Sequence, residues 1–190
     1  MPALPTPPHY LGEGNISPNP RRAIARRWLW ALVQSTAFRW SPRGCHRFRI
    51  ALLRLFGAQI PADGHVRIYP TAQVIYPWKL TCAPRVLIGP HVNIYNLATV
   101  TLGYGVQLSQ SVHLCAGTHD YSQWAMPLVT QPISIESNVW LGAEVFVGPG
   151  VTIGELAVIG ARSLVMKDQP PRMICAGHPC RPLKPRPEPQ

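Results

Sequence analysis

The chain has 190 residues, which suits one domain with short additions, and 46% of them are hydrophobic, so a real core can form. The formal charge of +10 admits three classes of partner: nucleic acid, an anionic membrane surface, or a polyanionic small molecule. Between Tyr69 and Arg162 only Lys79 and Arg85 are basic, so the chain lacks the basic face of a nucleic-acid binder. Five cysteines without a CxxC motif argue against a disulfide framework and favour a reducing compartment.

Prolines cluster at both ends of the chain, in residues 1–20 and in residues 182–189. Proline lacks a backbone N–H and has a fixed φ, so we expect neither end to form a regular strand or helix. Residues 1–20 and 185–190 are therefore predicted to be flexible tails. The N-terminus lacks a basic start followed by an apolar run, so no signal peptide is expected, and no stretch is long enough to span a bilayer.

Residues 21–60 are predicted to be helical, with a break near Gly44. The first part is rich in arginine and carries Trp28 and Trp30, a composition that suits a membrane interface. In the second part, four apolar residues form one helical face at i, i+4, i+7 and i+8: Phe48, Leu52, Leu55 and Phe56. Because amphipathic helices mostly cover their own core, packing on the body is the favoured interpretation and membrane contact is the alternative.

From His65 onward an aliphatic residue recurs every six residues. The longest run is Ile135, Leu141, Val147, Ile153, Ile159 and Val165, and the residue two positions earlier is mostly apolar or small. The earlier runs are Ile68, Val74 and Leu80, then Ile88 and Ile94, then Leu102, Leu108 and Leu114. Two steps of eight, Leu80 to Ile88 and Ile94 to Leu102, interrupt them. Each unit is expected to bury its aliphatic residue and the residue two positions earlier, which before Leu80 is Trp78. A hexapeptide period is the signature of a β-helix, so we predict an all-β fold over residues 61–168.

One gap breaks the repeat, because 21 residues separate Leu114 from Ile135 where three units would need 18. Residues 117–132 are therefore predicted to leave the coil as a loop, and loops on a rigid scaffold often carry function. The loop contains His119 and Asp120. Histidine changes its charge near neutral pH and suits general-base catalysis, whereas the simpler interpretation is a solvent-exposed loop residue.

These features together resemble the left-handed β-helix acyltransferases, in particular the maltose and galactoside O-acetyltransferases and the colanic-acid-biosynthesis type. The resemblance covers most of the chain and rests on seven segments: 53–58, 94–97, 115–122, 138–143, 148–154, 165–168 and 176–184. It implies a left-handed parallel β-helix of hexapeptide repeats, acetyl-CoA as co-substrate, and a homotrimer with active sites between subunits. The low share of charged residues, 14%, is consistent with surface buried between copies.

The resemblance also implies catalytic roles. His119 would be the general base, and the Ala143 backbone N–H would bind the oxyanion of the tetrahedral intermediate. Asn96 would contact the acceptor hydroxyl, unless it is only a corner residue of the coil. Asp120 would orient His119 or contact the acceptor, unless it only caps a turn. The loop has no glutamate where related sugar acetyltransferases carry one, so the group that orients His119 stays open.

A cofactor-binding segment is expected at residues 169–184. With the late coils it provides the candidate acetyl-CoA contacts: Trp140, Gly142, Ala143, Gly160, Ala161, Lys167, Gly177, Arg181 and Lys184. Small residues would let the pantetheine arm approach the backbone, and the basic residues would pair with phosphates unless they are solvated surface charges. No metal is expected. The three histidines His91, His113 and His119 suggest a zinc-dependent carbonic anhydrase of the same fold, but the segment 176–179 resembles cofactor machinery instead.

The sequence thus predicts an enzyme that acetylates a sugar hydroxyl in exopolysaccharide biosynthesis. We expect a cytoplasmic location, with peripheral contact at the inner membrane face if the acceptor is a lipid-linked glycan. Two alternatives stay open. One is an acetyltransferase for a small acceptor such as a free sugar, serine or an antibiotic, and the other is a non-catalytic β-helix scaffold.

Overall fold

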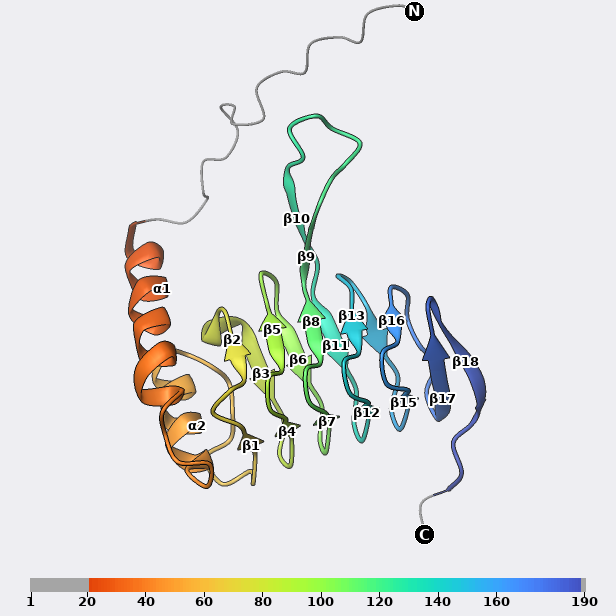
Figure 1. Cartoon of the computed structure of the whole chain (residues 1–190), viewed down its shortest axis with the longest axis horizontal. Coiled ribbons are helices and arrows are strands. Elements are labelled where there is room, and N and C mark those ends of the chain that lie inside the picture. The colour runs from red at the N-terminus through yellow and green to blue at the C-terminus, as the bar shows by residue number, and fades with distance from the viewer. Residues whose placement is uncertain (1–20, 189–190) are drawn as a thin grey trace, which may run out of the picture.

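The computed structural model describes residues 21–188, so the predicted tail at residues 1–20 lies outside the described residues. Short parallel strands wind into a β-helix, as predicted, and two N-terminal helices pack against its first coil (Figure 1). The helices are α1 (Arg21–Val33), which continues into a short π-helix (Gln34–Phe38), and α2 (His46–Leu55). None of the helices in the described range is long and apolar enough to cross a membrane.

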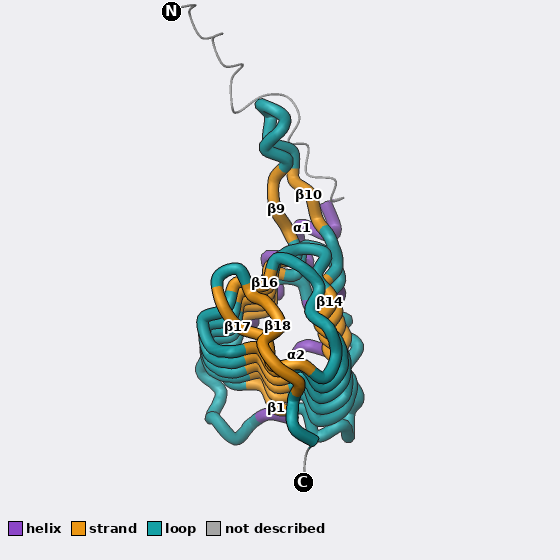
Figure 2. The backbone as a smooth tube through the Cα atoms, turned by 90° about the vertical axis from the view of Figure 1, so that its right-hand side faces the viewer, coloured by secondary structure: helices purple, strands orange, loops and turns teal. Residues whose placement is uncertain are grey.

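Three sheets form the faces of the β-helix (Figure 2). The first sheet contains β1 (Arg67–Ile68), β4 (Leu87–Ile88), β7 (Gln107–Leu108), β12 (Trp140–Leu141), β15 (Val158–Ile159), β17 (Met173–Gly177) and β18 (Cys180–Pro185). The second contains β2 (Gln73–Val74), β5 (Asn93–Tyr95), β8 (His113–Cys115), β13 (Phe146–Val147) and β16 (Leu164–Val165). The third contains β3 (Leu80–Cys82), β6 (Val100–Leu102), β11 (Ile133–Ile135) and β14 (Thr152–Ile153). We call the turns from first to second, second to third, and third to first sheet the first, second and third corners.

The core is the narrow interior of the coils. The aliphatic positions of the repeat are buried, and on the first sheet they stack as a ladder of Ile68, Ile88, Leu108, Leu141 and Ile159. The positions two residues earlier in the predicted count are buried too, except for Trp78. Removal of this continuous apolar surface from water is the main force that holds the coils together.

The register of the first coil differs from the prediction. Leu80 pairs with Val100 and Cys82 pairs with Leu102, so Cys82, not Leu80, occupies the repeat position. The extra residues of this coil therefore lie between Val74 and Cys82, where residues 77–79 form a 3-10 turn. Both steps of eight thus fall at the second corner, and Trp78, predicted to point inward, lies outside the coil beneath the Arg26 guanidinium.

The predicted loop at residues 117–132 is a projecting hairpin. Its strands β9 (Gly117–His119) and β10 (Leu128–Thr130) pair antiparallel, with His119 opposite Leu128. The hairpin leaves the β-helix at the second corner and points away from the coils (Figures 1 and 2). His119, the candidate base, therefore lies on an antiparallel β-hairpin and not on an irregular loop.

The N-terminal helices close the open end of the β-helix, where the edge strands would otherwise expose unpaired backbone groups. On β2, the Trp30 indole N–H donates to the Val74 carbonyl (2.6 Å) and the Gln34 side chain accepts from the Val74 N–H (2.9 Å). On β1, the Arg49 guanidinium donates to the Ile68 carbonyl (2.8 Å). Side chains of the helices therefore replace the missing neighbouring strand on two of the three sheets.

The face on which α2 packs matches the apolar face that periodicity indicated only in part, because Phe56 is buried and Leu52 packs against the core. On α2, Arg49, Ile50 and Leu53 are buried, whereas Phe48 and Leu55 are 45% and 79% exposed. The favoured expectation, that the predicted apolar face covers the core, is therefore wrong for these two residues. The side of α2 that packs on the first coil carries Arg49, Ile50 and Leu53, with the Arg49 guanidinium at the edge of β1, so Phe48 and Leu55 lie outside this contact.

The C-terminal strand β18 contains two of the clustered prolines. Pro182 and Pro185 lie in a strand that pairs antiparallel with β17, so the expectation that these prolines preclude a strand is wrong. The strand is at the edge of the first sheet, where a residue without an N–H can be tolerated. Proline-rich sequence here ends the sheet and does not prevent it from forming.

Candidate active site

His119 lies at the end of β9 with its side chain exposed. Its Nδ1 atom is 2.6 Å from the backbone carbonyl oxygen of Met126 on the other side of the hairpin. A carbonyl can only accept a hydrogen bond, so Nδ1 carries the proton and the Nε2 atom of the neutral ring keeps a free lone pair. The hairpin thus favours one tautomer of the His119 ring, and the basic Nε2 atom lies on the side of the ring away from the Met126 carbonyl.

Asp120 orders the tip of the hairpin. Its carboxylate accepts hydrogen bonds from the Ser122 N–H (3.0 Å), the Ser122 hydroxyl (2.6 Å) and the Gln123 amide (2.7 Å). The Ser122 hydroxyl, followed by Gln123 and the Ser122 N–H, lowers the pKa of this carboxyl group. No hydrogen bond in the described chain joins Asp120 to His119, so the geometry matches the turn-capping interpretation. The backbone carbonyl of Met126 orients the His119 ring. Every residue has such a carbonyl, so the sequence alone could not identify this partner.

Asn96 is buried at the second corner. Its Oδ1 accepts from the Tyr76 N–H (2.9 Å) and its Nδ2 donates to the Tyr76 carbonyl (2.7 Å). Both polar groups of the side chain are thus used by the same corner of the preceding coil. This geometry matches the simpler interpretation of Asn96 as a corner residue, and it leaves little of the side chain for an acceptor.

The small candidate residues lie together at the first corner. A Cβ atom on Gly142 would be 2.7 Å from the Ala161 nitrogen, and one on Gly160 would be 2.9 Å from the Ala176 Cβ, so successive coils stack closely here. Gly177 follows in the next coil with a positive φ of 109°. We call Gly142, Ala143, Gly160, Ala161 and Gly177 the first-corner row.

Ala143 and Trp140 border this row. The Ala143 carbonyl accepts from the Arg162 N–H at 2.8 Å, while its own N–H has no hydrogen-bond partner within residues 21–188. The Trp140 ring is half exposed on the outer side of β12 and donates from its indole N–H to the Ser109 hydroxyl at 3.0 Å. A free N–H donor and an aromatic wall are therefore present at the same corner.

Two of the three basic candidates come together. Lys167 and Arg181 line one hollow with Met166, Asp168 and Pro179, between the last coil and the C-terminal hairpin. Lys184 lies farther along β18, opposite Ile174, and does not line this hollow. The hollow thus holds two cations and one carboxylate, Asp168, which accepts a hydrogen bond from the Thr152 N–H at 2.7 Å.

One chain does not bring His119 to the first-corner row. The hairpin leaves at the second corner, and the second sheet lies between that corner and the row. Within a single chain, the candidate base and the candidate oxyanion donor therefore belong to two separate places on the surface.

The other histidines lie elsewhere. His113 is half-buried between the rings of Tyr95 and Phe146, and burial lowers its pKa. His91 is exposed at a corner, where its backbone N–H, not its ring, donates to the Thr71 hydroxyl. Over the described range, no three His, Cys, Asp or Glu side chains gather in a way that could hold a metal ion.

Comparison with known proteins decides the family. Residues 132–167 match the family model described as "Bacterial transferase hexapeptide (six repeats)". Over 160 residues the chain is 43% identical to the putative colanic acid biosynthesis acetyltransferase WcaF of Escherichia coli, across 84% of this chain and 87% of that protein. The chain belongs to the hexapeptide-repeat acetyltransferases.

Other hexapeptide-repeat acetyltransferases share shorter stretches or the fold. Galactoside O-acetyltransferase of Escherichia coli is 42% identical over 97 residues, which cover 50% of this chain and 48% of that protein. A maltose O-acetyltransferase from Clostridium difficile has a TM-score of 0.79 at 23% identity, over 87% of this chain and 88% of that one. A Vibrio cholerae hexapeptide-repeat acetyltransferase, solved with acetyl coenzyme A, has a TM-score of 0.79 at 24% identity, over 93% of both chains.

Proposed function

We propose that this protein transfers an acetyl group from acetyl-CoA to a sugar hydroxyl, in the biosynthesis of an exopolysaccharide. The observation that carries the proposal is the hydrogen bond from His119 Nδ1 to Met126, because it leaves Nε2 as a positioned base on an exposed hairpin. The name of the 43% identical WcaF protein supports a role in polysaccharide biosynthesis. The Vibrio cholerae neighbour solved with acetyl coenzyme A supports the donor.

The proposed reaction is a direct transfer. His119 Nε2 takes the proton from the acceptor hydroxyl while its oxygen forms a bond to the thioester carbonyl carbon. The Ala143 N–H donates to the oxygen on which negative charge develops, a contact worth several kcal/mol in a dehydrated site. The C–S bond then breaks, His119 returns its proton to the thiolate, and the products are an acetyl ester and free CoA.

The proposed site needs more than one copy of the chain, and we propose a homotrimer. His119 and the first-corner row lie at different corners of one chain, so the hairpin of one subunit would reach the row of its neighbour. This arrangement uses the free Ala143 N–H and the exposed Nε2 together. Cyclic assembly of identical chains repeats the same pairing at every interface.

A complementation experiment tests the shared site. His119→Asn removes the base from the hairpin, and Ala161→Trp fills the first-corner row at an exposed position. If each site joins two copies, an equal mixture refolded together should recover about a quarter of wild-type activity, because a random neighbour pair has both intact parts in one case of four. Each variant alone should be inactive. A mixture as inactive as its parts would contradict the shared site.

Lys167 and Arg181 are expected to bind the phosphates of the donor. Replacing either by alanine should raise KM for acetyl-CoA about tenfold with little change in kcat, because a charge-assisted hydrogen bond to bound substrate is lost. Lys184→Ala is the matched control and should change KM less than about twofold, since it lies outside their hollow. Equal effects of all three substitutions, measured by initial rates of CoA release, would contradict this placement.

Asp120→Asn separates turn capping from direct participation. The asparagine can still accept from Ser122, so kcat should fall less than about tenfold, far less than expected for removal of a general base. The hydrogen bonds lower the pKa of Asp120, so its contribution to hairpin order is present above the usual aspartate range and is lost as the pH falls through the lowered value. A fall as large as that of His119→Asn would place Asp120 in the chemistry.

The acceptor is tested by CoA release from acetyl-CoA with a panel of glycans, free sugars, serine and aminoglycosides. Release that depends on a glycan acceptor supports the proposal. Release only with a small acceptor would favour the second enzyme hypothesis. No release and no binding of acetyl-CoA would favour a scaffold.

A further inference from the structure

The N-terminal helix α1 turns an apolar side away from the protein. Ile24, Trp28 and Leu32 recur at i, i+4 and i+8 and are exposed, Trp28 by 73%. Trp30, on the opposite side of the helix, is buried against the first coil. A helix with large apolar residues on its outer side presents surface that soluble proteins usually cover.

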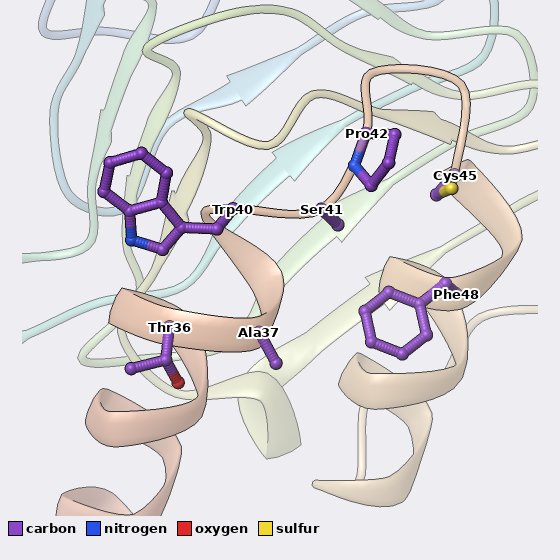
Figure 3. Close-up of a pocket in the computed structure, with 7 residues that line it drawn as sticks. All are labelled: Thr36, Ala37, Trp40, Ser41, Pro42, Cys45 and Phe48. Atoms are coloured by element: carbon purple, nitrogen blue, oxygen red, sulfur yellow. The ribbon is translucent and has the colours of Figure 1, made fainter.

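The same surface extends to α2. The spacing of four continues from Leu32 through Thr36 to Trp40, which is 80% exposed. Thr36 and Trp40 border a hollow whose opposite side is formed by Phe48, and Figure 3 shows these side chains on the two neighbouring helical segments. We define the apolar cap surface as the exposed large apolar residues of the two helices and their connection: Ile24, Trp28, Leu29, Leu32, Trp40, Phe48 and Leu55.

The charge of this region is of one sign. Residues 21–57 contain nine arginines and no aspartate or glutamate. Arg47 and Arg54 are exposed on α2 beside Phe48 and Leu55, and the Arg39 guanidinium lies 5.9 Å from the centre of the Trp40 ring. Exposed cationic side chains therefore neighbour the exposed apolar ones in this region.

Exposed apolar side chains together with uncompensated positive charge favour one kind of binding partner over the others. Two copies of a cap with nine arginines and no acid would repel each other, which disfavours a face-to-face dimer. An anionic bilayer attracts the arginines, and tryptophan side chains are favoured at the level of the lipid headgroups. We propose that the N-terminal cap binds the surface of a membrane that contains anionic lipids, with the apolar cap surface among the headgroups. This inference goes beyond the proposed reaction and does not depend on it.

Vesicle binding tests the proposal directly. The full-length protein is sedimented with vesicles of phosphatidylcholine alone, or with about 30% phosphatidylglycerol to supply an anionic surface. We expect binding to the anionic vesicles, weakened by high salt, and little binding to the neutral ones. Absence of binding to anionic vesicles at low salt would overturn the proposal.

Two pairs of variants test which residues bind. Trp28→Ser/Trp40→Ser should lower the partition coefficient at least tenfold, whereas Tyr104→Ser, an exposed aromatic on the coils, should leave it unchanged. Arg47→Gln/Arg54→Gln should lower binding to anionic vesicles about tenfold. The control Arg67→Gln/Arg85→Gln removes the same charge from a hollow on the coils and should have a much smaller effect.

Light scattering and thermal unfolding of each variant accompany the binding measurements. The oligomeric state and the unfolding temperature of Trp28→Ser/Trp40→Ser should match those of the wild type. A change of oligomeric state in this variant would assign the surface to contacts between copies and overturn the proposal. Equal loss of binding in the cap variants and their controls would overturn it as well.

Discussion

Substitution of His119 by asparagine should lower kcat by about 10²–10⁴, the usual contribution of a general base. Asparagine can keep the hydrogen bond to the Met126 carbonyl through its Nδ2 group, but it has no atom in the place of Nε2. The variant therefore removes the base and preserves the support of the hairpin. KM for acetyl-CoA should stay near the wild-type value, because the lost interaction acts in the transition state.

The measurement is acceptor-dependent release of CoA at saturating acetyl-CoA. His91→Asn is the matched control, since it makes the same change at an exposed corner histidine far along the chain from the hairpin. It should retain full activity. If His119→Asn stays active while His119→Ala does not, the histidine orders the hairpin and another group is the base.

Loss of the Arg49 side chain should cost about 3 kcal/mol or more of unfolding free energy, because it leaves a cavity and several unpaired acceptors. The guanidinium is fully buried, and burial lowers its pKa. It donates to the carbonyls of Ile68 (2.8 Å), Pro42 (2.8 Å) and Arg43 (2.7 Å), and to the Ser41 hydroxyl (2.7 Å). One side chain thus joins α2, the preceding turn and the edge of β1.

Urea unfolding of Arg49→Ala should therefore show a lower midpoint than the wild type. Arg47→Ala, two residues earlier on the exposed side of α2, is the matched control and should be nearly neutral. Arg49→Lys should lie between them, because a single ammonium group cannot reach all four acceptors. Amide exchange should become fastest in α2 and the first coil, since solenoid coils depend on their neighbours. Equal midpoints for Arg49→Ala and Arg47→Ala would contradict this role.

A membrane-bound cap would act together with the proposed acceptor specificity. Exopolysaccharide precursors carried on lipid would meet an enzyme already held at the bilayer surface. The two proposals, acetyl transfer to a glycan and membrane binding by the cap, can be connected in one experiment. It compares the rates of the wild type and of Trp28→Ser/Trp40→Ser with vesicle-bound and with free glycan acceptors. Each proposal also keeps its own test.

By itself, the sequence determined the period of the coils, the buried positions of nearly every repeat, and the place where a histidine-bearing segment leaves the β-helix. These features are local, because every sixth residue meets the same narrow interior and an interruption of the count marks a projection. Only the tertiary structure decided that Cys82 takes the repeat position, that Met126 supports His119, and that Asn96 and Asp120 bind backbone and hairpin groups. It also decided which faces of α1 and α2 turn outward. Each of these features depends on a partner group from another coil, strand or turn. Many of the partners are backbone groups, which every residue has, so a pattern of side chains does not identify them.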